Sequence, residues 1–219
     1  TALTALGESF LSTSAPLALG AYHVFSTNSG DVTNPNFRPD LLYAHPRLRT
    51  EAQLRTDGSR DLRAQTKLVT VPTFALQGIT SDVQFTMYNS ATAPIPWIRN
   101  EELILLRAEA NLGLGNVPAA IADINLIRTT SGGLAPIIDQ STADVLGELL
   151  YNKRYSLVWE GGHTWIDMRH YGRLAQIPVK AADPRLFPAM PIPVAECQPR
   201  VPQPTGCGIV TGITPPPQP

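Results

Sequence analysis

The stretch NEELILLRAEANLGLGNVPAAIADINLIR, residues 100–128, lies near the middle of the chain and predicts the fold. In its first half, leucine and alanine recur at helical spacing, which gives one helix face an apolar character. Two glycines end this helix, and Asn116 and Pro118 begin a second one that carries an isoleucine stripe. We therefore expect a helix hairpin of the tetratricopeptide type, with Ala110 buried where the two helices cross.

A third apolar and periodic stretch, LGELLYNKRYSLVWEGG at residues 146–162, follows the hairpin. Ser141 and Asp144 precede it and are able to cap the free N–H groups of a first helical turn. We therefore expect a helix over residues 141–160 that packs on the hairpin. A short helix with Trp165 on one side should follow.

The segments on either side of this helical core have a different character. Before it, extended stretches at 21–25, 69–74 and 83–88 are separated by turn residues, and the last two could pair as a hairpin. Residues 92–96 should link this layer to the first core helix. Beyond Gly172, the density of proline predicts an extended strap without helices. The residues expected to anchor this strap are Leu186, Phe187, Met190 and Ile192.

These patterns predict a mainly α fold in three parts, all of which belong to one domain. Residues 1–95 form an irregular, loop-rich layer with short strands, and this layer is the expected ligand side. Residues 96–172 form the tetratricopeptide-like helical core, and residues 173–219 form the proline-rich extended strap.

Composition excludes two classes of protein. A net charge of -1 with 16% charged residues provides no clustered excess of Lys and Arg for nucleic acid. No stretch reaches the roughly 18 to 20 apolar residues that a membrane helix needs. The two cysteines, Cys197 and Cys207, lie close together in the proline-rich tail and suit an oxidising compartment. They form either a disulfide, which we expect, or two free thiols.

A set of separated motifs resembles the C-terminal half of the SusD/RagB family, and their shared order and spacing are specific. The motifs are Pro96 to Leu103 (PWIRNEEL), Leu105 to Ala110 (LLRAEA), Ile124 to Arg128 (INLIR), Asn152 to Arg154, Glu160 with Gly161, Trp165 to Arg169 (WIDMR), Pro191 to Pro193, and Glu196. Asp61, Arg63 and Lys67 match a segment that in this family belongs to the irregular layer over the helices. The fold implied is a SusD-like αα superhelix.

The resemblance also implies a function. Members of this family are surface nutrient-binding lipoproteins that pass ligand to a SusC-like TonB-dependent transporter in the outer membrane. The chain departs from the family pattern where Tyr155 and Ser156 follow Asn152 to Arg154, and where His163 and Thr164 precede Trp165. Family members are also considerably longer. We therefore expect the lipid anchor and any export signal to lie outside this chain.

Catalytic and metal-binding constellations are incomplete in the sequence. His163, Asp167 and His170 would share one helix face and could in principle ligate zinc. We favour the plainer alternative without a metal, in which Asp167 pairs with a nearby arginine and His170 lies at the surface. No two carboxylates stand out by spacing as an acid and base pair, and no nucleophile elbow or phosphate loop is present. We expect no catalysis and no cofactor.

Aromatic side chains are the remaining candidates for ligand binding, because the C–H face of a sugar ring stacks on an aromatic plane. Trp97, Trp159 and Trp165 fall on motifs or apolar helix faces and are expected in the core. The family's ligand sits in loops outside the helices, which favours four aromatic residues of the irregular layer, although ordinary packing is the alternative for each. The four candidates are Tyr22, Phe25, Tyr43 and Tyr88.

The sequence therefore favours a non-catalytic, cell-surface protein that binds an oligosaccharide, or less readily a peptide, for an outer-membrane importer. The alternative is a helical-repeat scaffold at the cell surface whose ligand is another protein. A hydrolase is the third and least favoured class.

Overall fold

The structure is a computed structural model. It describes residues 1–38, 42–76, 79–138, 144–161, 163–179, 185–189, 192–202, 207 and 212. The chain divides into two compact units, one formed by Thr1–Phe74 with Thr80–Thr164 and the other by Ala75–Ile79 with Trp165–Pro219. The predicted division at residues 95 and 172 stays a prediction.

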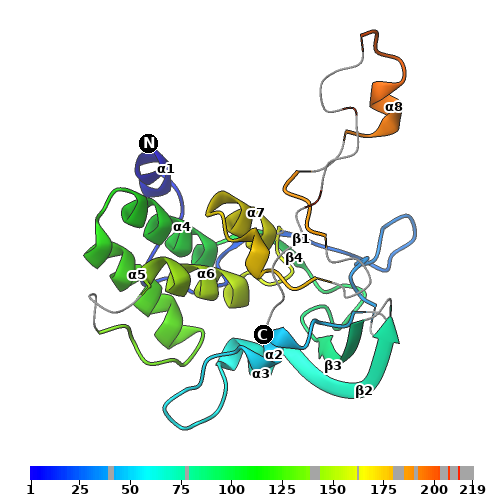
Figure 1. The fold of residues 1–219 in the computed structure, drawn as a ribbon. Coiled ribbons are helices and arrows are strands. Elements are labelled where there is room, and N and C mark those ends of the chain that lie inside the picture. Colours follow the sequence, from blue (N-terminus) through cyan, green and yellow to red (C-terminus); the bar gives the residue numbers. More distant parts are fainter. Residues whose placement is uncertain are drawn as a thin grey trace. The chain divides into compact units, whose positions relative to one another are not determined.

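The first unit holds most of the helices and strands (Figure 1). In chain order its elements are α1 (Ala2–Gly7), β1 (Gly20–His23), α2 (Arg47–Thr50), α3 (Leu62–Lys67), β2 (Leu68–Leu76), β3 (Ile79–Phe85), β4 (Ile95–Arg99), α4 (Asn100–Gly113), α5 (Val117–Thr130) and α6 (Val145–Ser156), with the tip of the β2 and β3 pair assigned to the other unit. More of the described residues lie in helices than in strands, which agrees with the predicted helical fold.

Helices α4, α5 and α6 lie side by side and enclose the main hydrophobic core (Figure 1). The fully buried members of this core come from all three helices and are Ile104, Leu105, Ala108, Ile124, Ile127 and Leu149. A second, smaller cluster joins Ala52 and Ala64 of the preceding layer to Tyr155 of α6. The layer before the helices is therefore packed directly on α6.

The hairpin of α4 and α5 forms where the sequence predicts it. Glu101 and Glu102 lie in the first turn of α4, where acidic side chains favour the helix dipole. Gly115 takes a positive φ of 77°, which ends α4 with a left-handed residue. The prediction for Ala110 is wrong. Ala108 is the fully buried alanine, and Ala110 lies two positions on at a half-buried site.

Helix α6 is shorter than the predicted range of 141–160. Asp144 caps it by accepting a hydrogen bond from the Gly147 N–H at 2.9 Å, and the predicted partner Ser141 lies outside the described residues. The helix ends at Ser156 because side chains from other elements bind its last carbonyls, as shown below. Trp159 then takes a positive φ of 64°, which is incompatible with a continuing helix.

Two sheets of two strands each complete the described elements, one formed by β1 and β4 and the other by β2 and β3. Strand β1 pairs with β4 in an antiparallel register, so residues predicted as a linker at 92–96 instead enter a strand at Ile95. The close approach requires Gly20, because a Cβ there would lie 2.2 Å from the Ile98 carbonyl oxygen. Strands β2 and β3 form the second pair, and residues 42–44 extend it by hydrogen bonds to Val83 and Phe85.

The second unit contains most of α7 (His163–His170), the 3₁₀ turn η1 (Leu174–Gln176) and α8 (Val194–Cys197). The prediction that no helix follows Gly172 is therefore wrong. The four residues of α8 lie between Pro193 and Pro199, so neither proline interrupts this short helix. Of the predicted anchors, Phe187 and Ile192 are partly exposed, and Met190 lies outside the described residues.

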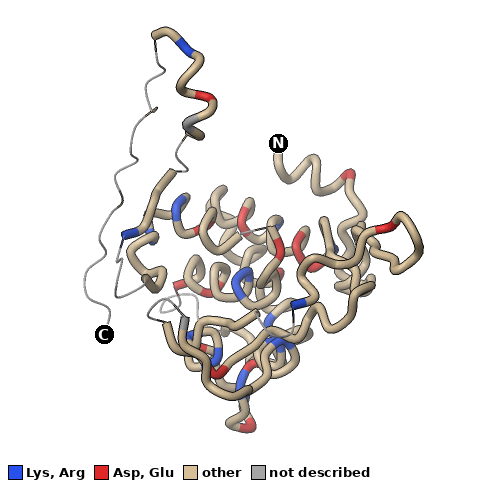
Figure 2. Tube along the Cα trace, turned by 90° about the vertical axis from the view of Figure 1, so that its right-hand side faces the viewer, with Lys and Arg blue, Asp and Glu red and all other residues tan. Residues whose placement is uncertain are grey.

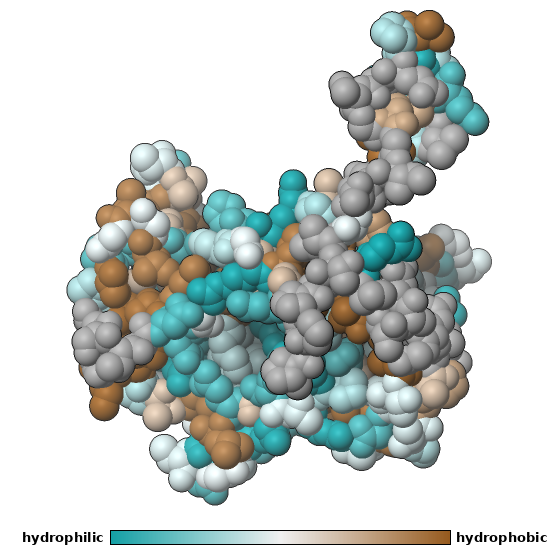
Figure 3. Space-filling model, viewed as in Figure 1, coloured by the Kyte–Doolittle hydropathy of each residue, from teal (hydrophilic) through white to brown (hydrophobic). Residues whose placement is uncertain are grey.

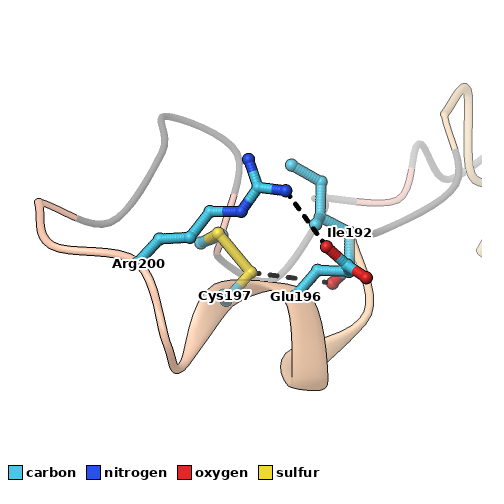
Figure 4. The surroundings of a disulfide bond; sticks show 5 residues. Ile192, Glu196, Cys197 and Arg200 are labelled. Atoms are coloured by element: carbon cyan, nitrogen blue, oxygen red, sulfur yellow. Dashed lines mark hydrogen bonds and ion pairs between the residues drawn. A yellow bond between two sulfur atoms is a disulfide. The ribbon is translucent and has the colours of Figure 1, made fainter.

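Cys197 at the end of α8 and Cys207 form a disulfide, with their Cα atoms 5.6 Å apart (Figure 4). Arg200 donates to the Glu196 carboxylate at 3.1 Å beside it. The disulfide closes a loop of the proline-rich tail, and Val201 in the described part of this loop is 96% exposed. It thereby takes the place of a hydrophobic core in holding that loop.

Candidate ligand-binding site

Residues of the family-like motifs meet in a buried polar network rather than in a cavity. Arg99, at the end of β4, donates twice to the Glu160 carboxylate, at 2.8 and 3.0 Å, and once to Glu101 at 2.6 Å. It also donates to the Ser156 carbonyl at 2.7 Å. The Ser156 hydroxyl in turn donates to Glu101 at 2.6 Å. Arg99, through the Glu101 carboxylate and the Ser156 carbonyl, thus connects β4 with α4 and with the end of α6.

The same network continues into the layer that precedes the helices. Arg63 of α3 donates to both Asp61 oxygens, at 3.0 and 2.6 Å, and to the Asn152 and Ser156 side chains of α6 at 3.0 and 2.9 Å. Lys67 donates to the Tyr155 and Ser156 carbonyls at 3.0 and 2.5 Å. These contacts bind the last carbonyls of α6 and explain why the helix stops there.

The electrostatics of this network match a structural role. Burial alone would raise the pKa of the Glu101 carboxyl, but Arg99 and the Ser156 hydroxyl hold that pKa below its usual value. Burial lowers the pKa of Lys67 to about 8, with Glu160 opposing that shift. Each of these charges has a hydrogen-bond partner within the network. The network therefore fastens the irregular layer to the helices.

Charges elsewhere in the described chain are also mixed in sign. Figure 2 shows Lys and Arg positions interspersed with Asp and Glu positions, without an extended run of one sign. Arg107 of α4 pairs with Asp123 of α5, and Lys153 of α6 pairs with Glu109 of α4, both within 2.8 Å.

The four aromatic residues predicted to bind ligand lie at different places in the first unit. Tyr22 and Phe25 lie in and just after β1, and the Tyr22 hydroxyl donates to the Ala18 carbonyl at 2.5 Å. Tyr43 stacks on Phe74, with ring centroids 5.2 Å apart.

Tyr88, the fourth predicted residue, follows β3 and is buried there. Its hydroxyl lies 3.4 Å from the Trp159 carbonyl, and burial raises its pKa to about 12. A role of all four residues in binding stays a prediction.

The prediction that the tryptophans form part of the core is wrong. Trp97 in β4 is 74% exposed, and its ring is near parallel to that of His23, with centroids 6.4 Å apart. Trp159 is 42% exposed and packs against Phe85 at 5.1 Å. Trp165 is half-buried and donates its indole N–H to the Phe187 carbonyl at 3.2 Å. Position within a motif does not by itself bury a side chain.

A cavity of about 220 Å³ opens beside β3 in the predicted ligand layer, and we call it the Phe85 cavity. Its lining residues are Phe37, Arg38, Leu42, Val69, Gln84, Phe85, Thr86, Tyr88 and Asn89. Three aromatic rings and two amides thus surround a space smaller than the roughly 300 to 1,000 Å³ of drug-sized ligand sites. It has room for one ring or one end of a longer ligand.

Polar groups of this cavity are available to a ligand. Within the described part of the chain, the side-chain amides of Gln84 and Asn89 make no hydrogen bond, and the Arg38 guanidinium contacts only the Pro35 carbonyl at 3.4 Å. The Thr86 hydroxyl already donates its hydrogen to the Thr66 carbonyl at 2.8 Å. The sequence analysis missed Arg38, Gln84 and Asn89, since single polar residues in loops and strands carry no periodic or motif signal.

A second cavity, of about 230 Å³, is lined mainly by aliphatic residues and two arginines. Arg49 is held there by Asp82 at 2.7 Å and Thr70 at 3.2 Å, and Arg60 donates to the Thr50 and Ala52 carbonyls at 3.0 Å. Its cations are therefore already engaged. The Phe85 cavity is the better candidate, because it combines aromatic walls with uncommitted amides.

Among the described residues, no three His, Cys, Asp or Glu side chains converge as metal ligands, so the disfavoured zinc arrangement of His163, Asp167 and His170 is not seen there. His163 instead lies 3.4 Å from Glu102 of α4. No helix in the described ranges has both the length and the apolar character to cross a bilayer.

Comparison with known proteins bears on the fold. No protein-family model and no curated protein matches the chain. Among solved structures it is similar to a SusD superfamily protein from Bacteroides vulgatus ATCC 8482, with a TM-score of 0.50 and 20% sequence identity. The match covers 64% of this chain and 38% of that one, so the chain spans well under half the length of its structural neighbour. A likeness of this kind supports the SusD-like helical fold.

Proposed function

We propose that the protein is a non-catalytic, cell-surface nutrient-binding protein that captures an oligosaccharide at the Phe85 cavity. The observation that carries this proposal is the cavity itself, which is lined by Phe37 and Phe85 together with Gln84 and Asn89, whose side-chain amides make no hydrogen bond within the described residues. Planar amides donate to and accept from neighbouring sugar hydroxyls, while aromatic faces take the C–H face of the ring. The combination suits a sugar better than a purely apolar ligand.

Delivery to a SusC-like TonB-dependent transporter and location at the outer membrane are part of the same proposal. The SusD-like fold and the order of the family-like motifs support them. The disulfide between Cys197 and Cys207 suits such an extracytoplasmic location.

A glycan array followed by calorimetry tests the proposal. The informative variant is Phe85→Leu, which removes an aromatic plane while keeping apolar volume, and Phe10→Leu is the matched control at an exposed aromatic site away from the cavity. Loss of a stacking contact worth about 0.5 to 1.5 kcal/mol should weaken binding roughly 2- to 12-fold in Phe85→Leu alone. Failure of every glycan to bind, or release of hydrolysed product, would contradict the proposal.

A protein-interaction scaffold is the alternative, and exposed apolar residues support it. Leu114, at the end of α4, is 72% exposed, and Ile138 is 91% exposed. Apolar residues also gather over the α4 and α5 hairpin in the face shown in Figure 3. Replacement of Leu114 by Ser should leave glycan binding unchanged if the Phe85 cavity holds the ligand. If the protein binds no glycan, and Leu114→Ser loses a protein partner that co-purifies with wild type, the scaffold would be favoured.

A further inference from the structure

We propose that the Phe85 cavity selects an acidic oligosaccharide, with Arg38 pairing with the carboxylate of a uronic acid residue. This inference rests on the proposed capture of an oligosaccharide and names its chemical class. Arg38 would act as a specificity residue that touches the ligand directly.

The state of Arg38 distinguishes it from most arginines of the described chain. Arginines that pair with an Asp or Glu side chain within 4 Å are Arg47, Arg49, Arg55, Arg63, Arg99, Arg107, Arg128, Arg154 and Arg200. Arg38 has no such partner among the described residues, and its Nε contacts a main-chain carbonyl at the long distance of 3.4 Å. Its planar set of donors therefore remains able to bind a carboxylate.

Charge in the cavity favours an anion. Among the described lining residues, Arg38 is the one with a charged side chain at neutral pH, because no Asp, Glu, Lys or His contributes to the lining. Tyr88 stays neutral, since burial raises its pKa to about 12. Among the described lining residues, a carboxylate would therefore meet a positive charge and no acidic side chain, whereas a cationic ligand would meet that positive charge without a compensating acid.

The remaining walls favour a sugar ring as the carrier of the carboxylate. Gln84 and Asn89 offer amides to ring hydroxyls, and Phe37 and Phe85 offer aromatic surface to a ring face. A peptide C-terminus carries the same carboxylate but brings no hydroxylated ring to these groups. A uronic acid presents carboxylate, hydroxyls and an apolar face within one ring, which a cavity of about 220 Å³ can take.

Calorimetry at low ionic strength would measure this selectivity. The probes are short oligogalacturonides and oligoglucuronides, each with its methyl ester, and a set of peptides with free C-termini. The variants are Arg38→Gln and the control Arg200→Gln, which removes the same charge from an exposed pair with Glu196. The acid should bind wild-type protein about tenfold more tightly than its ester, and Arg38→Gln should lose that difference while Arg200→Gln keeps it. Added salt should weaken binding of the acid but not of the ester.

Three results would overturn the inference and leave oligosaccharide capture standing. One is equal affinity for acid and ester, with binding that Phe85→Leu still weakens. Another is undiminished preference for the acid in Arg38→Gln. The third is tighter binding of peptides than of acidic sugars. Absence of binding to every saccharide would overturn the inference together with the proposed function.

Discussion

Removal of the Arg63 charge should destabilise the protein strongly, because its partner Asp61 has no exposed surface. Arg63→Met keeps a side chain of similar length but deletes the hydrogen bonds to both Asp61 oxygens and to the Asn152 and Ser156 side chains. An unpaired buried charge of this kind costs about 3 to 5 kcal/mol. Asp61 would still accept from the Tyr151 hydroxyl at 2.8 Å, so we expect the lower end of this range, about 3 kcal/mol.

A double-mutant cycle isolates the charge pair from packing. Asp61→Asn keeps the side-chain oxygen that caps α3 through the Arg63 N–H at 2.8 Å, but it removes the negative charge. Because each single variant leaves one charge unpaired and the double variant leaves none, the double variant should be more stable than the sum of the two losses predicts. We expect a coupling energy of roughly 1 to 3 kcal/mol from urea unfolding followed by tryptophan fluorescence.

Arg200→Met is the control for this cycle, because it deletes an arginine whose ion pair with Glu196 is exposed. Exposed pairs contribute about 0.2 to 1 kcal/mol, so this variant should unfold close to wild type. Additive losses in the Asp61 and Arg63 cycle, or a loss in Arg63→Met no larger than that in Arg200→Met, would refute the structural role of the network.

Three further outcomes are expected. Ala108→Trp should overpack the core and cost about 1 to 3 kcal/mol, whereas Ala110→Trp, at a half-buried site, should cost clearly less in parallel urea titrations. Trp97→Ala should change the free energy of unfolding by no more than about 0.5 kcal/mol, because the ring is mostly exposed, and a loss of several times that size would show that it is buried in solution. The pKa of Lys67 is lowered to about 8 from 10.5, so between these values the folded state binds fewer protons than the unfolded state. The stability of wild type relative to Lys67→Met should therefore rise with pH across that range, and a falling difference would contradict the lowered pKa.

The sequence could predict the helical core because its signals are local. Gly115 and Pro118 mark the turn of the hairpin, and the apolar spacing on either side is helical. The exact end of α6 could not be predicted, since Lys67 and Arg99 reach its last carbonyls from distant positions in the chain. Strand β4 was missed for a similar reason, because its partner β1 lies far back in the sequence.

The candidate site was only partly accessible to sequence reasoning. The search for aromatic residues outside the helices led to Tyr88, which lines the Phe85 cavity. Position within a motif led to Trp97 as a core residue, although that ring is exposed. Whether an aromatic ring is covered depends on the layer above it, which local patterns do not report. Arg38 could not be found at all, because its lack of a carboxylate partner among the described residues is a property of the folded chain.

The most direct test of oligosaccharide capture is an NMR titration of the isotope-labelled protein with the tightest ligand from the glycan array. The backbone amides of Gln84, Phe85 and Asn89 should shift in proportion to the bound fraction, and Phe85→Leu should reduce these shifts at equal ligand concentration. Shifts confined to residues around Trp97, or to the exposed end of the α4 and α5 hairpin, would contradict a ligand site in the Phe85 cavity.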